Sequence, residues 1–240
     1  MNKRVASGAQ ITGSIATVWS KVAHDLRQPI QSLMLLTHVM ALTEPADDRL
    51  KTQRSMEESL LSLQAMLDTL TSIARLETGV DVPRAANLDL FAMASAALQQ
   101  SVGDGATHTN EIPLAGTSMG ITADKKLAGV LISGVLQVAI KYAQKRHVHA
   151  ATRSRNGQAL LEIVFQAAAL TQAQQSATFI EIGYRNKVAT ISHTAAGVGL
   201  LTLIAGHAGA SLEIGSLSHE EQSIAIVFPQ RTPAPKPTHE

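Results

Sequence analysis

The sequence contains no cysteine, few aromatic residues and almost no net charge. The lack of cysteine excludes disulfide bonds, thiol nucleophiles and cysteine-ligated zinc or iron–sulfur sites. Aromatic residues make up 3% of the chain, too few for a stacking platform that grips single-stranded nucleic acid. The 20 Lys and Arg residues are balanced by 19 Asp and Glu residues. The positive field of a nucleic-acid clamp or a polybasic membrane binder is therefore missing, and neither partner is expected.

Long apolar runs are also absent. No run reaches the roughly 18 consecutive apolar residues that a transmembrane helix needs. Gly8, Gln10 and Thr12 interrupt the stretch after Met1–Arg4, where a secretory signal would have a long apolar core. A cytoplasmic protein is therefore expected. Hydrophobic residues make up 45% of the 240 residues and charged residues 16%, which is typical of a globular chain with one large or two small domains.

The chain is predicted to be an α+β protein of two domains between two disordered tails. Residues 1–12 are polar and contain glycine, and residues 231–240 carry proline at every second position near their start. Between these tails the pattern is purely helical at first and later mixes helices with strands. The predicted domains are a helical one at 13–80 and a mixed one at 86–230.

The first domain is predicted to be a helical hairpin. Apolar residues in alternating steps of three and four predict helices along Ile15–Met40 and Met56–Ala74, with Ile30 on the packed stripe of the first. Pro29 is expected to kink the first helix, Thr43–Asp48 to form the turn, and Gly79 to stop the second helix. A lone helical hairpin buries little apolar surface, so two chains are expected to pair into a dimeric four-helix bundle.

The second domain is predicted to be an α/β sandwich, with helices on one face of a mixed sheet. Helices are expected at Leu90–Gln100, at Lys125–Lys145 with Asp124 as its cap, and at Gly197–Ala208. Strands are expected at Ile121–Thr122, Val148–Arg153, Leu160–Phe165, Ser211–Gly215 and Ser223–Phe228. Asn156-Gly157 predicts a tight hairpin turn, and residues 166–190 are interpreted as irregular.

The most informative segment is His24-Asp25-Leu26-Arg27-Gln28-Pro29. His24 stands off the apolar stripe of its helix and is expected to project from the side of the bundle. Asp25 can orient or deprotonate the imidazole, and Arg27 can steady nearby anionic oxygens. A nucleophilic imidazole beside an acid suits phosphoryl capture. The plain alternative is a solvated or structurally satisfied histidine.

This segment resembles the phosphoacceptor box of two-component histidine kinases, whose usual form is His-Asp/Glu-Leu-Arg-x-Pro. The second helix ends in Arg75-Leu76-Glu77-Thr78-Gly79, similar to the Ser-Arg-Leu-Glu-x-Gly ending of the same domain. The resemblance implies that His24 is the phosphorylated residue and Asp25 its acid/base partner. Gln28 stands where related kinases with phosphatase activity carry Thr or Asn to orient water, and its alternative is an ordinary exposed residue.

The resemblance to the family's ATP-binding domain is uneven. Asp124–Leu127 and Ala139–Ala143 look like the ends of a helix on which the family places two Asn residues, one of them a magnesium ligand. The matching positions are Gly134 and Val138, and neither offers the oxygen that magnesium requires. Magnesium binding by this domain is therefore not expected.

The family's Asp-x-Gly-x-Gly turn, which recognises adenine, corresponds here to Phe165-Gln166-Ala167-Ala168-Ala169. Only a vestigial glycine box remains, at Gly197 and Gly199. Such a pair is a weak signal, because glycines also occur at the start of ordinary helices. Each missing contact would contribute about 1–3 kcal/mol, as hydrogen bonds to charged groups do. ATP binding and autophosphorylation are therefore expected to be lost.

A phosphoacceptor bundle joined to a degenerate ATPase-like domain resembles the histidine phosphotransferases of the ChpT type. That resemblance implies a homodimer whose His24 relays a phosphoryl group between receiver aspartates, with magnesium supplied by the receiver. A divergent sensor histidine kinase that still uses ATP is one alternative, and a receiver phosphatase working through Gln28 is a lesser one. Another is a catalytically silent partner that dimerises with an active kinase through Leu60, Leu63, Leu67 and Leu70. His147 and His149 share one face of a predicted strand, but the sequence places no third ligand beside them. His193, His207 and His219 show no metal-ligand spacing, so no metal site is expected.

Overall fold

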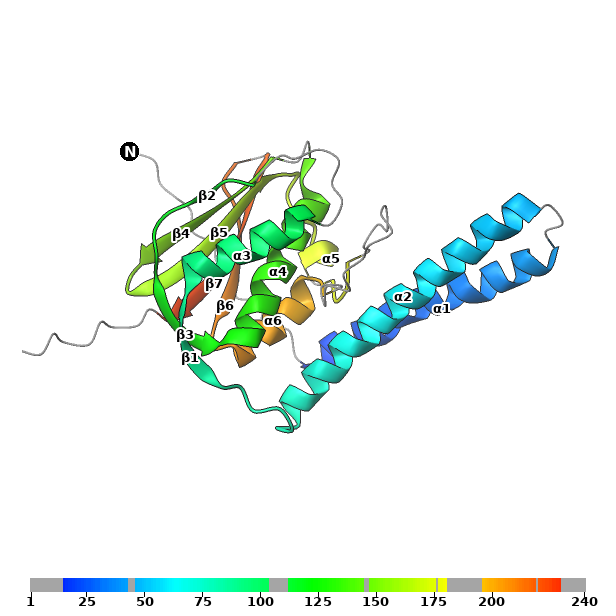
Figure 1. Ribbon diagram of the computed structural model, residues 1–240, viewed down its shortest axis with the longest axis horizontal. Helices are drawn as coiled ribbons and strands as arrows, with labels where there is room; N and C mark the ends of the chain where they lie inside the picture. Colours follow the sequence, from blue (N-terminus) through cyan, green and yellow to red (C-terminus); the bar gives the residue numbers. More distant parts are fainter. Residues whose placement is uncertain are drawn as a thin grey trace, which may run out of the picture.

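The computed structural model combines a helical hairpin with an α/β domain, the α+β architecture that the sequence predicts (Figure 1). The structure describes residues 15–42, 46–103, 112–144, 147–175, 177–180, 196–218 and 220–229. The tails predicted at 1–12 and 231–240 lie outside the described residues. No helix within the described ranges has both the length and the apolar character that crossing a membrane requires.

Helices α1 (Ile15–Leu42) and α2 (Ala46–Glu77) run side by side as the predicted hairpin (Figure 1). The turn prediction is wrong at its end, because Ala46–Asp48 already belong to α2, where acidic residues suit the positive end of a helix dipole. Helix α1 continues without interruption through Pro29. Helix α2 stops as predicted just before Gly79, whose φ of +71° is a conformation that glycine adopts readily.

The hairpin has one packed face and one open face. Val22 of α1 and Met66, Leu70 and Ile73 of α2 are buried in the main core. The prediction is wrong for Ile30, which is 45% exposed, whereas the neighbouring Pro29 is half-buried. Other large apolar side chains of the hairpin are also exposed, namely Met34, Leu35, Val39, Leu42, Leu50, Leu60, Leu61 and Leu67. The single chain therefore leaves a broad apolar surface open.

The α/β domain contains a mixed five-stranded sheet in the order β2-β4-β5-β7-β6. Its strands are β2 (Leu114–Ala115), β4 (Val148–Arg155), β5 (Gln158–Gln166), β6 (Ser211–Ser216) and β7 (Glu221–Pro229). Among the described strands of this sheet, only β2 and β4 pair in parallel. The predicted turn between β4 and β5 is confirmed, with φ of +54° at Asn156 and +73° at Gly157.

A second, two-stranded sheet pairs β1 (Ala85–Asp89) with β3 (Gly120–Asp124) in antiparallel fashion. The sequence predicted only part of β3, and it missed β1 and β2. Strand β1 is mostly exposed and lacks the alternation of apolar and polar residues that marks a strand, while β2 is two residues long. Their pairing depends on partners distant in the sequence.

Helices α3 (Leu90–Gly103), α4 (Lys125–Tyr142) and α6 (Val198–His207) cover one face of the larger sheet (Figure 1). Helix α4 ends three residues earlier than predicted. A short helix, α5 (Gln172–Gln175), lies within the stretch that was interpreted as irregular. The core between helices and sheet is mainly aliphatic, with Phe165 and Phe228 as its largest fully buried side chains.

Asp124 joins α4 to the two-stranded sheet. Its Oδ1 accepts hydrogen bonds from the backbone N–H groups of Lys126 at 2.9 Å and Leu127 at 3.0 Å, which confirms the predicted cap. Its Oδ2 accepts one from the N–H of Arg84 at 2.7 Å. Partial burial alone raises the pKa of Asp124, but these hydrogen bonds outweigh it, and the pKa lies below its ordinary value.

Replacing Asp124 with Ala is expected to lower the free energy of unfolding at pH 7 by about 1–2 kcal/mol, because three N–H groups lose their acceptor. Since the folded-state pKa is lowered, this contribution is complete above the unfolded value of about 3.9 and is lost as the pH falls through the folded value. Urea denaturation at neutral and acidic pH measures both effects. Asp124→Asn is the control, because Asn caps well but does not titrate. If the loss of free energy of unfolding in Asp124→Ala did not change with pH, the lowered pKa of Asp124 would be contradicted.

Candidate functional site

His24 lies on α1 with its imidazole open to solvent. Its side chain is 68% exposed, and its Nδ1 lies 3.2 Å from Oδ1 of Asp25, whose side chain is 26% exposed. The position agrees with the expectation that His24 projects from the side of the hairpin. A partner protein can therefore reach this imidazole, while its identity as the phosphoacceptor stays a prediction.

Arg27 and Gln28 follow His24 at spacings of three and four residues, which puts all three on one side of α1. Both side chains are exposed, and the following Pro29 is half-buried. The structure thus brings His24, Arg27 and Gln28 together as an exposed polar strip. Charge stabilisation by Arg27 and water orientation by Gln28 stay predictions.

A residue from the α/β domain also reaches this site. The hydroxyl of Thr178, in the segment between α5 and α6, donates a hydrogen bond to Oδ2 of Asp25. Thr178 is fully buried, and its backbone C=O accepts a hydrogen bond from the N–H of Gly197 at 2.7 Å. Nothing in the sequence pattern marks Thr178 as a neighbour of Asp25, because the two are 153 positions apart and residues 166–190 show no periodicity.

A second polar contact joins the hairpin to the α/β domain. Nε2 of His207, in the last turn of α6, lies 3.0 Å from Oε1 of Glu77 at the end of α2. Buried side chains of α2, including Leu70 and Ile73, belong to the same apolar core as α6. The hairpin is therefore docked on the α6 side of the domain by both polar and apolar contacts.

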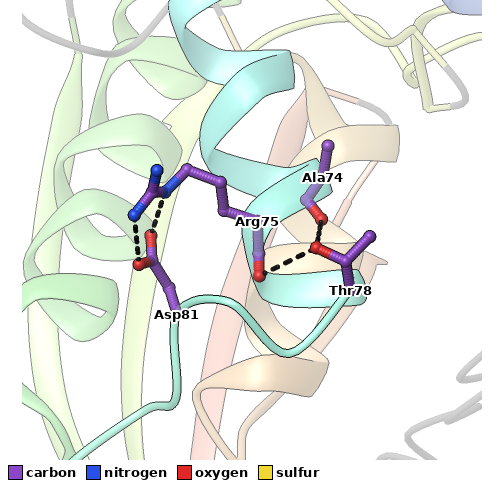
Figure 2. A network of polar contacts seen from close by, with 4 residues as sticks. All are labelled: Ala74, Arg75, Thr78 and Asp81. Atoms are coloured by element: carbon purple, nitrogen blue, oxygen red, sulfur yellow. Dashed lines mark hydrogen bonds and ion pairs between the residues drawn. The ribbon is translucent and has the colours of Figure 1, made fainter.

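Arg75 and Asp81 form a bidentate ion pair at the exit of α2, seen in Figure 2. The distances are 2.9 Å from Nε to Oδ2 and 2.8 Å from Nη2 to Oδ1. The hydrogen bond from Arg75 lowers the pKa of the Asp81 carboxyl. The N–H of Asp81 also donates to the C=O of Arg75 at 3.0 Å, and the Thr78 hydroxyl donates to the C=O of Ala74 at 2.7 Å. The Arg-Leu-Glu-Thr-Gly sequence thus closes the last turn of α2 and directs the chain into the next domain.

The two positions where the resemblance implies Asn lie inside the core. Gly134 and Val138 are buried on α4. A Cβ atom placed on Gly134 would lie 2.5 Å from Cδ2 of Leu201 in α6, and Leu201 is itself buried. Helices α4 and α6 therefore touch directly at Gly134, and neither position presents an oxygen ligand for magnesium.

The position of the implied adenine-binding Asp is also part of the core. Phe165 is 1% exposed near the end of β5, where it is paired with Val148 and Gln222 on the neighbouring strands. Ala167, at one of the implied glycine positions, is buried, and its N–H donates to the C=O of Glu220 at 2.9 Å. A buried phenyl ring offers no hydrogen-bond acceptor to adenine.

The remaining glycine box is used by the chain itself. A Cβ atom on Gly197 would lie 2.5 Å from the carbonyl oxygen of Ala177, so glycine lets this neighbouring segment pass close to the start of α6. The N–H of Gly199 donates to the same oxygen at 2.8 Å. Free N–H groups at a helix N-terminus are what a phosphate binds, and here one of them already has an internal acceptor.

At the described positions, these residues do not fit a magnesium–nucleotide complex. The implied amide and carboxylate ligands are replaced by glycine, valine and phenylalanine in a packed core, and the glycine box binds a carbonyl of the chain. Residues 181–195 lie outside the described part. Within that part, no group of three or more His, Asp or Glu side chains is placed to hold a metal ion.

A pair of glycine substitutions tests the contact between α4 and α6. Gly129→Ala, on the same helix where a Cβ meets nothing within 4 Å, is expected to raise the free energy of unfolding by about 0.5–1 kcal/mol through helix propensity. Gly134→Ala is expected to lower it by about 1 kcal/mol, because crowding against Leu201 outweighs that gain. Urea denaturation compares the two variants. An equal gain from both would mean that the space beside Gly134 is open.

No family model and no curated protein matches this sequence. Solved structures do match it. The histidine kinase AdeS of Acinetobacter baumannii has a TM-score of 0.64 and 14% identity, over 87% of this chain and 98% of that chain. Full-length ShkA, solved in complex with AMPPNP, has a TM-score of 0.57 and 14% identity, over 92% of this chain and 47% of that one. This chain therefore spans about half of the ShkA chain.

A bacterial phosphotransferase covers 90% of this chain with 15% identity and a TM-score of 0.42, and this score is too low to support the expected closeness to ChpT-type proteins. That closeness stays a prediction. AdeS and ShkA cover 87% and 92% of this chain at TM-scores above 0.5, so they share its overall fold. The resemblance inferred from the phosphoacceptor box is confirmed at the level of architecture: the chain has a histidine-kinase-like fold.

Proposed function

We propose that this chain is a histidine phosphotransfer protein of a two-component phosphorelay. His24 takes a phosphoryl group from the aspartate of one receiver domain and passes it to the aspartate of another. The observation that carries this proposal is an accessible imidazole beside an acid, in a chain whose implied nucleotide ligands are replaced by core packing. Such a protein needs a phosphorylated partner, and it needs no nucleotide of its own.

The chemistry is an in-line exchange between an acyl phosphate and an imidazole. A ring nitrogen of His24 forms a bond to phosphorus, while the bond from phosphorus to the receiver's aspartate oxygen breaks and leaves its electron pair on that carboxylate. Asp25 holds the ring, and Arg27 helps to neutralise the phosphoryl oxygens. Magnesium is supplied by the receiver. The second transfer reverses these steps on another receiver.

The packing of α4 and α6 favours phosphotransfer over the alternative of a divergent kinase. A kinase would need metal and adenine ligands, yet the implied positions Gly134, Val138 and Phe165 contribute only to apolar packing. The alternative of a silent partner makes no use of His24. An imidazole that is 68% exposed and contacts an acid is better accounted for by a role in transfer.

Substitution of His24 by Ala is expected to abolish phosphorylation, because it removes the nucleophile. The purified chain is incubated with labelled ATP and magnesium, first alone and then with a receiver that a separate kinase has charged. Label is expected on the wild type only when the charged receiver is present. His24→Ala should take no label and should retain its circular dichroism spectrum, because the side chain lies outside the core.

His38→Ala is the matched control, since His38 is a second exposed histidine on α1. It is expected to be labelled like the wild type. Label on the His24→Ala protein would refute the proposal. Label from ATP alone would identify the chain as a kinase, and a wild type that no charged receiver labels would favour the silent partner.

The proposal includes a homodimer built through the open face of the hairpin. The exposed leucines at 60 and 67 lie one heptad apart on α2, the spacing of residues that line a helical bundle. An exposed apolar surface of this kind is commonly covered by a partner. Pairing two copies would complete a four-helix bundle, as the sequence predicts.

The double substitution Leu60→Glu and Leu67→Glu is expected to weaken self-association at least about 100-fold, because each buried leucine contributes about 1.5–3 kcal/mol. Sedimentation equilibrium measures the dissociation constant. Leu217→Glu is the control, because Leu217 is similarly exposed but lies in the β6–β7 connection. A wild-type monomer, or an equal effect of the control, would contradict the proposed interface.

A further inference from the structure

The carboxylate of Asp25 lies between two polar groups from different domains. Its Oδ1 is 3.2 Å from Nδ1 of His24 on the same helix, and its Oδ2 accepts a hydrogen bond from the hydroxyl of Thr178 in the α/β domain. Asp25 is 26% exposed, whereas the imidazole of His24 is 68% exposed. The α/β domain therefore contacts the acid without covering the imidazole.

The contact between Asp25 and His24 selects one tautomer of the imidazole. An ionised carboxylate accepts hydrogen bonds and cannot donate them, and a neutral imidazole carries its proton on only one nitrogen. The contact to Oδ1 is therefore favourable when Nδ1 carries the proton. Nε2 then keeps its lone pair and is the nitrogen able to attack an electrophile. A group that fixes the Asp25 carboxylate also fixes which nitrogen of His24 reacts.

Thr178 is well placed to fix that carboxylate. Its side chain is fully buried, and its backbone C=O is held by the N–H of Gly197 at 2.7 Å. On either side, the C=O of Ala177 accepts from Gly199, and Phe179 forms a β-bridge with Ala196. The hydroxyl is thus presented from a segment anchored at the start of α6. Without it, Asp25 would be an aspartate on an exposed part of α1 with one fewer hydrogen bond to set its orientation.

We propose that Thr178 is a positioning residue for phosphotransfer, which acts through Asp25 to hold His24 with its proton on Nδ1 and its lone pair on Nε2. This inference rests on the proposed function. When Nε2 forms its bond to phosphorus, the bond from phosphorus to the receiver oxygen breaks with its electron pair, and the proton stays on Nδ1. The Asp25 carboxylate then stabilises the positive charge of the phosphorylated ring. The α/β domain thus contributes a hydroxyl to the site.

Thr178→Val tests this role, because it removes the hydroxyl and keeps the side-chain volume. In the free protein, nitrogen-15 NMR reports the tautomer of His24, whose signals are assigned by their loss in His24→Ala. The wild type is expected to carry the proton on Nδ1, and Thr178→Val is expected to shift it toward Nε2. The transfer rate at saturating receiver should fall about tenfold, with little change in the receiver concentration that gives half of the maximal rate. Thr178→Ser keeps a hydroxyl and should restore both readouts.

Glu77→Gln is the matched control, because it weakens a separate polar contact between hairpin and domain and leaves Thr178 intact. It is expected to leave the tautomer of His24 unchanged. If Thr178→Val does not fold, Thr178→Ala is measured in the same way. An unchanged tautomer in the variant without the hydroxyl, or an equal shift in Glu77→Gln, would overturn the role of Thr178. The NMR readout needs no phosphoryl group, so a wild type that takes no label from a charged receiver refutes the proposed function separately.

Discussion

The direct contact between α4 and α6 determines most of what is distinctive about this molecule. Gly134 has no side chain, so Leu201 can pack against the backbone of α4, and α6 lies close. Gly197, at the start of α6, also has no side chain, so the carbonyl group of Ala177 can lie close to its backbone. At the start of α6, Thr178 contacts Asp25, and at its other end His207 lies beside Glu77. The contact between α4 and α6 also fills the space beside Gly134, where the resemblance implied an Asn.

The sequence predicted the fold well where the signal is local. The alternating apolar steps of α1 and α2, the Asp124 cap and the Asn156-Gly157 turn each act over a few residues, and the structure confirms them. The short strands β1 and β2 were missed, because their pairing is decided by distant partners and their residues carry no pattern. The apolar periodicity also placed Ile30 on the packed face, although its side chain is exposed and the neighbouring Pro29 is half-buried.

The sequence predicted the part of the candidate site that lies on α1, but not the part that the α/β domain contributes. The order His24-Asp25-Leu26-Arg27 is contiguous, so both the exposed imidazole and its acid could be located from the sequence. Thr178 could not be located from the sequence. Its contact with Asp25 arises from the docking of two domains and from backbone hydrogen bonds that any residue can make. The replacement of Asn and Asp at positions 134, 138 and 165 was visible in the sequence. The packing of the buried Leu201 of α6 against Gly134 was not visible in the sequence.

The ion pair between Arg75 and Asp81 has a consequence for this domain contact. As an exposed pair it contributes little to the free energy of folding, yet its two parallel hydrogen bonds fix the direction in which the chain leaves α2. The connection from there to β1 is short, so the hairpin and the α/β domain meet as tethered bodies. A short tether gives a high effective concentration of one group near the other. The tether therefore favours the hydrogen bond between the Thr178 hydroxyl and the Asp25 carboxylate, which would be weak between separate molecules.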